Sequence, residues 1–118
     1  MNLHLRTSER DGVMVLSAHG EIDVATAPQL RQEIVEIASA GSGPLVVDLD
    51  GVDFLDSTGL GVLVSGLKRF RTLGTDLLLV STRTRILRVF EITGLMQVFS
   101  ISDTVDAAVA AARAGRQP

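Results

Sequence analysis

The feature that most constrains the fold is an alternation of short apolar runs with segments of helical periodicity. Leu45–Leu49 is a short, mostly apolar run of strand formers, as expected for a strand covered on both faces of a sheet. It is followed by a helix over 57–73, a strand over 76–80, a helix over 84–93, a strand over 96–101 and an alanine-rich helix. Because strands that alternate with helices are joined by right-handed βαβ crossovers, the sequence predicts an α/β fold.

The residues before this alternation predict a β-hairpin and one helix. Segments 3–8 and 13–19 are strand-like and flank Asp11-Gly12, a pair that supplies the positive φ a tight hairpin turn needs. A helix over 25–40 follows, with Pro28 in its first turn, where the missing N–H costs little. We therefore expect a mixed sheet of four to five strands with about four helices, in which the hairpin precedes the βαβ units.

The length and composition bound the organisation and the class of function. With 118 residues, the chain fits one domain, expected over 1–114, and a polar, disordered tail is expected over 115–118. The chain has no cysteine and a net charge of −3, and it has four Phe but no Trp or Tyr, so neither a structural zinc site nor direct nucleic-acid binding is expected. Its aliphatic runs are too short for a membrane span, and its first ten residues lack a secretory signal, so a cytoplasmic protein without a membrane anchor is expected.

The segment Asp56-Ser57-Thr58-Gly59 places three consecutive helix-capping residue types where the 57–73 helix should begin. One of them suffices for a cap, so the remaining hydroxyls are free for another role. A nucleophile elbow requires glycine two residues before the serine, and Leu55 stands there instead. No lysine and hydroxyl pair follows the nearby glycines as a phosphate-binding loop requires. Catalysis by Ser57 is therefore not expected.

An enzyme alternative rests on four nearby carboxylates. Asp48, Asp50, Asp53 and Asp56 follow or end a predicted parallel strand, where sites of open α/β sheets lie and where oxygen ligands hold divalent cations. Their spacing argues against a tight cage, since Asp48 lies inside the strand. A small metal-dependent phosphohydrolase nevertheless stays open as an alternative at this point.

The predicted 57–73 helix has one apolar face and one face of small side chains. Thr58, Gly61, Val62 and Ser65 lie opposite the apolar sector, so a partner's backbone could approach closely there. Glycine in a helix costs about 1 kcal/mol relative to alanine, and Gly61 with Val62 therefore indicates a contact surface. A phosphate on Ser57 would add a charge of about −1.5 to −2 at the edge of this surface and could end such a contact.

Three segments of the sequence match a known family: Gly20-Glu21-Ile22-Asp23, the stretch from Val46 to Leu63 with its Asp-Ser-Thr-Gly-Leu-Gly core, and Ile92-Thr93-Gly94-Leu95. With these segments the chain resembles the STAS domain of bacterial anti-sigma factor antagonists. The resemblance spans roughly residues 5–112 and implies a STAS-type fold.

The resemblance also implies a function without catalysis, cofactor or metal. In that family, the serine matched by Ser57 is phosphorylated by an anti-sigma factor that is a serine kinase, and a metal-dependent phosphatase removes the phosphate. The unmodified protein captures the anti-sigma factor and frees a sigma factor. We expect Ser57 as the phosphorylation site, with Thr58 as the fallback, in a monomer or weak dimer. The resemblance and the helix face together give the expected partner-binding set: Asp23, Asp56, Ser57, Thr58, Gly61, Val62 and Ser65.

One further alternative remains within the same family. STAS domains also occur as non-catalytic scaffold or sensor subunits of larger signalling complexes. In such a subunit Ser57 would be only a cap, and its replacement would change stability by about 1 kcal/mol without changing binding.

Overall fold

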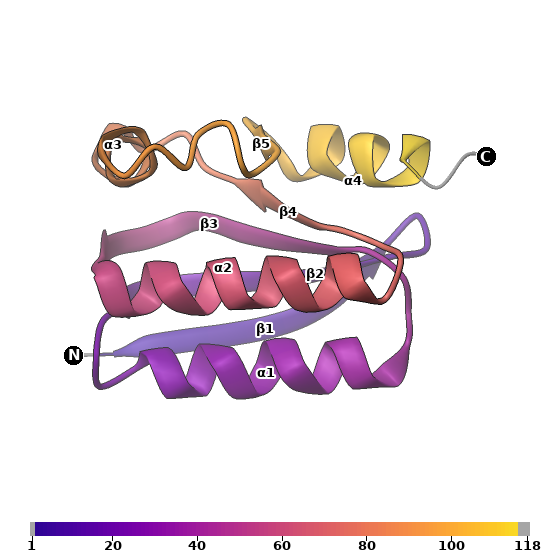
Figure 1. Ribbon diagram of the computed structural model, residues 1–118, viewed down its shortest axis with the longest axis horizontal. Helices are drawn as coiled ribbons and strands as arrows, with labels where there is room; N and C mark the ends of the chain where they lie inside the picture. The colour runs from indigo at the N-terminus through magenta and orange to yellow at the C-terminus, as the bar shows by residue number, and fades with distance from the viewer. Residues whose placement is uncertain (1, 116–118) are drawn as a thin grey trace.

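The expected hairpin-led α/β fold is confirmed in a computed structural model that describes residues 2–115. The elements are β1 (Leu3–Arg10), β2 (Val13–Ile22), α1 (Ala27–Ala40), β3 (Leu45–Leu55), α2 (Ser57–Thr72), β4 (Leu77–Val80), α3 (Thr84–Ile92), β5 (Ile101–Ser102) and α4 (Val105–Ala114). They form one five-stranded sheet in the order β1-β2-β3-β4-β5 (Figure 1). β1 and β2 are antiparallel, and each later pair is parallel.

The hairpin turn has the geometry that the Asp-Gly pair predicts. Asp11 and Gly12 have φ angles of 51° and 82°, and Arg10 pairs directly with Val13. Positive φ at both central residues is the mark of a turn whose twist matches that of the two strands. The turn therefore determines which residues of β1 and β2 pair with each other.

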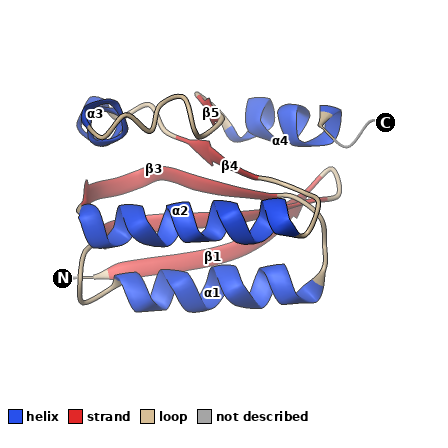
Figure 2. Cartoon of the chain, in the orientation of Figure 1, coloured by secondary structure: helices blue, strands red, loops and turns tan. Residues whose placement is uncertain are grey.

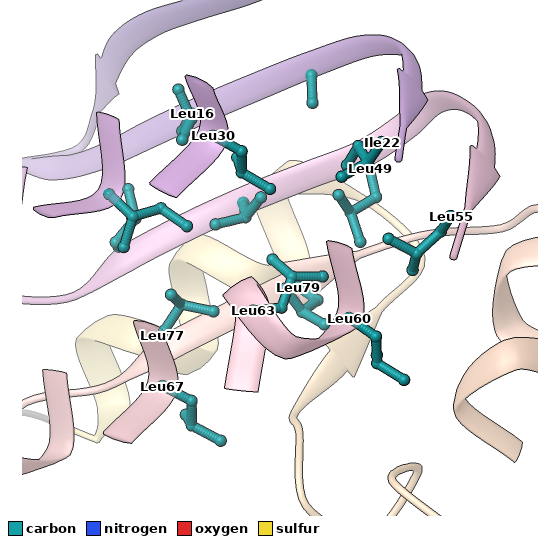
Figure 3. Close-up of a cluster of buried hydrophobic side chains, with 14 of the residues drawn as sticks. Leu16, Ile22, Leu30, Leu49, Leu55, Leu60, Leu63, Leu67, Leu77 and Leu79 are labelled. Carbon is teal, nitrogen blue, oxygen red and sulfur yellow. The ribbon is translucent and has the colours of Figure 1, made fainter. Parts of the chain in front are cut away.

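The sheet is covered on both faces. α1 and α2 lie side by side against one face, as Figure 2 shows, and their buried side chains join Val47 and Leu49 of β3 in the larger core cluster. α4 covers part of the other face, where Val46 meets Ala108 and Val109. This two-sided burial explains why β3 begins with the apolar run that the sequence shows. Figure 3 shows side chains of the larger cluster, including Leu16 from β2, Leu30 from α1, Leu63 from α2 and Leu79 from β4.

Several strand boundaries differ from the prediction. β3 runs on to Leu55, so residues 50–55 are strand rather than loop, and β2 continues alongside it to Ile22 through two register shifts. The expected strand over 96–101 is wrong, because only Ile101–Ser102 pairs with β4. Residues 96–98 form a turn instead, in which the N–H groups of Val98 and Phe99 donate to the carbonyl of Leu95.

This turn has a packing reason. It carries the Phe99 ring into the core, where the ring meets Phe90 edge-on with centroids 5.4 Å apart. Of the predicted tail over 115–118, only Gly115 is among the described residues, and it ends α4. Residues 116–118 and Met1 lie outside them.

Candidate functional site

The corner between β3 and α2 is capped by Asp56. Its backbone is extended, and its carboxylate accepts hydrogen bonds from the N–H groups of Thr58 (2.9 Å) and Gly59 (3.0 Å). Its own N–H donates to the carbonyl of Ile22 at 3.2 Å, which ties the corner to the end of β2. Of the three candidate caps, the structure therefore uses the carboxylate.

The two neighbouring hydroxyls are not used by the fold. Ser57 and Thr58 are both exposed, and neither hydroxyl takes part in a hydrogen bond within residues 2–115. Ser57 is the first residue of α2 and Thr58 the second. Either side chain can therefore be modified without breaking an interaction that holds the helix start.

The two hydroxyls line different hollows beside α2. Thr58 lines a groove of ≈ 650 Å³ between α1 and α2, together with Val24 and Val62. Ser57 lines a separate hollow of ≈ 410 Å³ beside α2, and Leu95 lines the same hollow. Modification of one hydroxyl or the other would consequently fill a different part of the surface.

The glycines of α2 divide into packing and surface positions. A Cβ on Gly59 would come within 2.5 Å of Ile22 Cγ2 and 2.7 Å of a Leu55 methyl, so this glycine lets α2 sit closely on the sheet. A Cβ on Gly61 would meet nothing within 4 Å. Packing accounts for Gly59, whereas Gly61 stays a candidate for a surface that a partner approaches.

The other predicted partner-binding residues of α2 also reach its surface. Gly61 and Ser65 are exposed, and Val62 is half-buried between α1 and α2. The end of β2 and the start of α1 lie at the same end of the molecule as Ser57 (Figure 1), because Ile22 of β2 pairs with Leu55 of β3.

Asp23 has an internal role that the sequence did not reveal. Its side chain is 6% exposed, and its carboxylate accepts from the N–H groups of Ala25 (2.9 Å) and Thr26 (3.0 Å). The hydrogen bond from the Thr26 N–H is the main cause that holds the pKa of Asp23 below its usual value, against the opposing effect of burial. The carboxylate thus shapes the turn before α1, and Val24, which is 72% exposed, is the side chain that this turn presents.

The four aspartates of the enzyme alternative have four separate tasks. Asp48 accepts from the N–H of Asp50, while Asp56 caps α2. Asp50 accepts from the N–H and the hydroxyl of Thr82, each at 2.8 Å, and these bonds hold its pKa below the usual value. Asp53 pairs with Arg83 at 2.6 Å.

The contacts of Asp50 and Asp53 connect two elements of the fold instead of forming a metal site among the described residues. Thr82 and Arg83, which sequence reasoning missed, fasten the start of α3 to β3, and Arg83 also donates to the carbonyl of Asp50 at 2.8 Å. Across residues 2–115, no three His, Cys, Asp or Glu side chains are grouped so that they could hold a metal ion. Nor does any helix in that range have the length and apolar character that a membrane crossing requires.

Comparison with known proteins agrees with the fold. The family model of the STAS domain matches residues 4–108. Anti-sigma-B factor antagonists of Staphylococcus aureus and Bacillus subtilis are 34% and 37% identical to this chain over 103 and 102 residues. These matches cover 87% and 86% of this chain and 95% and 93% of the relatives. The crystal structure of an anti-sigma factor antagonist from Mycobacterium paratuberculosis is similar with a TM-score of 0.88 at 34% identity, over 95% of both chains.

Proposed function

Because the chain belongs to the STAS domain family of anti-sigma factor antagonists, we propose that it binds an anti-sigma factor and thereby releases a sigma factor. The anti-sigma factor is also a serine kinase that phosphorylates Ser57, and the phosphate switches the protein off by weakening this binding strongly. A metal-dependent phosphatase restores the binding form. The cycle runs in the bacterial cytoplasm, and the chain itself contributes no catalytic group.

The observation that supports this proposal most directly is that Asp56, and not Ser57, caps the start of α2. Asp56 caps the helix, so the exposed Ser57 hydroxyl has no structural task among the described residues. A kinase can therefore transfer the γ-phosphoryl group of ATP to this oxygen without first opening the helix. ADP leaves, and the serine proton passes to a base or water in the kinase site.

The same cap determines what a phosphate on Ser57 does. The N–H groups of Thr58 and Gly59, which would otherwise bind an anion, already donate to Asp56. The phosphate keeps the favourable interaction with the helix dipole, about 0.3–1 kcal/mol, but it meets a carboxylate instead of free amides. Its charge of about −1.5 to −2 is therefore directed outward rather than neutralised within the fold.

The outward charge falls on a mostly apolar contact surface. The hollow beside Ser57 is lined by Leu60, Gly61, Val64 and Leu95, and by Ser65 and Lys68 farther along α2. A partner that packs into this hollow would have to desolvate the phosphate beside Asp56. Removal of water also strengthens the repulsion between these two negative groups, so binding is weakened without unfolding the chain.

Two variants test the switch against the purified anti-sigma factor. Ser57→Ala should bind like the wild type, while Ser57→Asp should bind about tenfold or more weakly, since even one carboxylate introduces charge into the hollow. Ser8→Asp is the matched control, because it introduces the same charge at an exposed serine of β1, outside both hollows. Equal dissociation constants for Ser57→Ala and Ser57→Asp, measured by calorimetry, would refute the switch and favour the scaffold alternative.

Mass spectrometry of the chain after incubation with ATP and the kinase identifies the modified residue. We expect one phosphate on Ser57. A phosphate on Thr58 instead would place it in the groove between α1 and α2 and would move the switch to that side of the helix.

A further inference from the structure

The groove between α1 and α2 is a second concave surface beside the Ser57 corner. The two helices run side by side (Figure 2), and Gly66 lets them pack closely, since a Cβ there would lie 3.1 Å from a methyl of Ile34. The groove extends from Thr58 to Arg69. The twelve residues 58–69 span about 17 Å of helix, so the groove has room for about three turns of another helix.

The lining of the groove is amphipathic. Its apolar part comes from Val24, Ala27, Val35 and Val62. Val24 is 72% exposed, although it is a large apolar side chain next to a buried turn. An exposed apolar side chain that continues a groove indicates a surface that a partner covers.

The polar part of the lining is cationic. Arg31 from α1 and Arg69 from α2 lie at the same part of the groove. Both also line the narrow cleft at Ile34 and Gly66. Neither guanidinium takes part in an ion pair within residues 2–115. Glu36 is the one carboxylate in the lining, and the side-chain amide of Gln32 already donates to it at 3.3 Å. The net charge of the chain is −3, so two arginines without an ion pair beside apolar side chains make this part of the surface locally positive.

We propose that this groove is a second docking site, which takes an amphipathic helix of the anti-sigma factor with carboxylates directed at Arg31 and Arg69. The proposal rests on the function proposed above and adds the chemistry of the partner segment. The apolar side of that helix covers Val24 and Val62, and its acidic residues form charge-assisted hydrogen bonds with the two guanidinium groups.

The separation of the two sites has a consequence for the phosphorylated state. A phosphate on Ser57 lies in the other hollow and does not enter the groove, so the groove contact survives in the phosphorylated chain. The residual affinity of that form should then depend on Arg31 and Arg69, and it should fall as the salt concentration rises.

The test uses Arg31→Gln combined with Arg69→Gln in the full chain and calorimetric titration with the purified anti-sigma factor. We expect the double variant to bind about tenfold more weakly than the wild type and to lose most of the salt dependence of binding, because rim charges contribute modest, screened interactions. Arg85→Gln combined with Arg88→Gln is the matched control, since it removes the same charge from exposed positions of α3 outside the groove. A third variant, Val24→Asp, should also weaken binding by placing a carboxylate where the acidic helix lies.

The outcomes separate the two proposals. A wild-type chain that binds no anti-sigma factor refutes the proposed function and this inference with it. Wild-type binding that the double variant retains in full, or loses no more than the α3 control, refutes the groove site alone. Sedimentation of the free chain gives a further check: a dimer that the double variant dissociates would assign the groove to a second copy and overturn the proposal.

Discussion

Replacing Gly61 by alanine should stabilise the protein, while the same replacement at Gly59, two residues earlier in the same helix, should not. Alanine is favoured over glycine within a helix by about 1 kcal/mol, because glycine loses more backbone entropy on folding. At Gly61 this gain comes without a clash, since the new methyl meets nothing within 4 Å. We expect Gly61→Ala to raise the free energy of unfolding by about 0.5–1 kcal/mol.

At Gly59 the gain is offset by overpacking. The new methyl would lie 2.5 Å from Ile22 Cγ2 and 3.2 Å from Ile22 Cβ, whereas carbon atoms pack at about 3.5–4.0 Å. Ile22 is fully buried and cannot move aside without disturbing the sheet. Overpacking of this kind costs about 1–3 kcal/mol, so the net change is a loss of up to about 2 kcal/mol.

Urea denaturation of the two variants and of Gly66→Ala provides the measurement. Gly66 is an intermediate case, because its methyl would lie 3.1 Å and 3.2 Å from side-chain methyls of Ile34 and Leu77. The expected order of stability is Gly61→Ala, then Gly66→Ala, then Gly59→Ala, with about 1–3 kcal/mol between the extremes. A Gly59→Ala variant as stable as Gly61→Ala would refute the assignment of Gly59 to packing.

Two further predictions concern carboxylates. Asp56→Ala should lower the free energy of unfolding by about 0.5–2 kcal/mol in urea denaturation, because the N–H groups of Thr58 and Gly59 lose their acceptor; an unchanged stability would show that the carboxylate does not act as the cap. Asp50 has a lowered pKa in the folded state, so its contribution to stability is full above the ordinary value of 3.8 and is lost as the pH falls through the lower folded value. Acid denaturation of Asp50→Asn should therefore show a smaller fall in stability below about pH 4 than the wild type, and identical acid profiles would contradict this role.

The order of the elements could be predicted because each signal was local. The switch from strand-like to helix-like periodicity marks every helix, and the Asp11-Gly12 turn fixes the hairpin. The extent of β3 could not be predicted, since Asp50, Gly51 and Asp53 are typical loop residues. They remain in the strand because β3 pairs with β2 as far as Leu55. Asp50 and Asp53 have no partner themselves and are accommodated by the two register shifts. Tertiary pairing here overrides local propensity.

The corner between β3 and α2 could be predicted from the sequence, but the structural role of each of its residues could not. Asp56, Ser57 and Thr58 are all residue types that cap helices, and only the conformation shows that Asp56 takes the amides. Asp23 looked like a surface carboxylate, yet Ala25 and Thr26 turn back to bind it. An aspartate followed three residues later by threonine is a signal for such a turn, and it could have identified Val24 as the exposed residue.

The arrangement at the start of α2 separates stability from regulation. The cap belongs to Asp56, close packing belongs to Gly59, and the hydroxyl of Ser57 belongs to neither. If Ser57 were itself the cap, a phosphate on its oxygen would alter the bond that holds the helix start, and each phosphorylation cycle would also perturb folding. Because the adjacent carboxylate performs that task, modification can change what the surface binds while the helix stays in place. In the switch that we propose, which acts on binding rather than on folding, Asp56 would hold the helix and Ser57 would carry the charge.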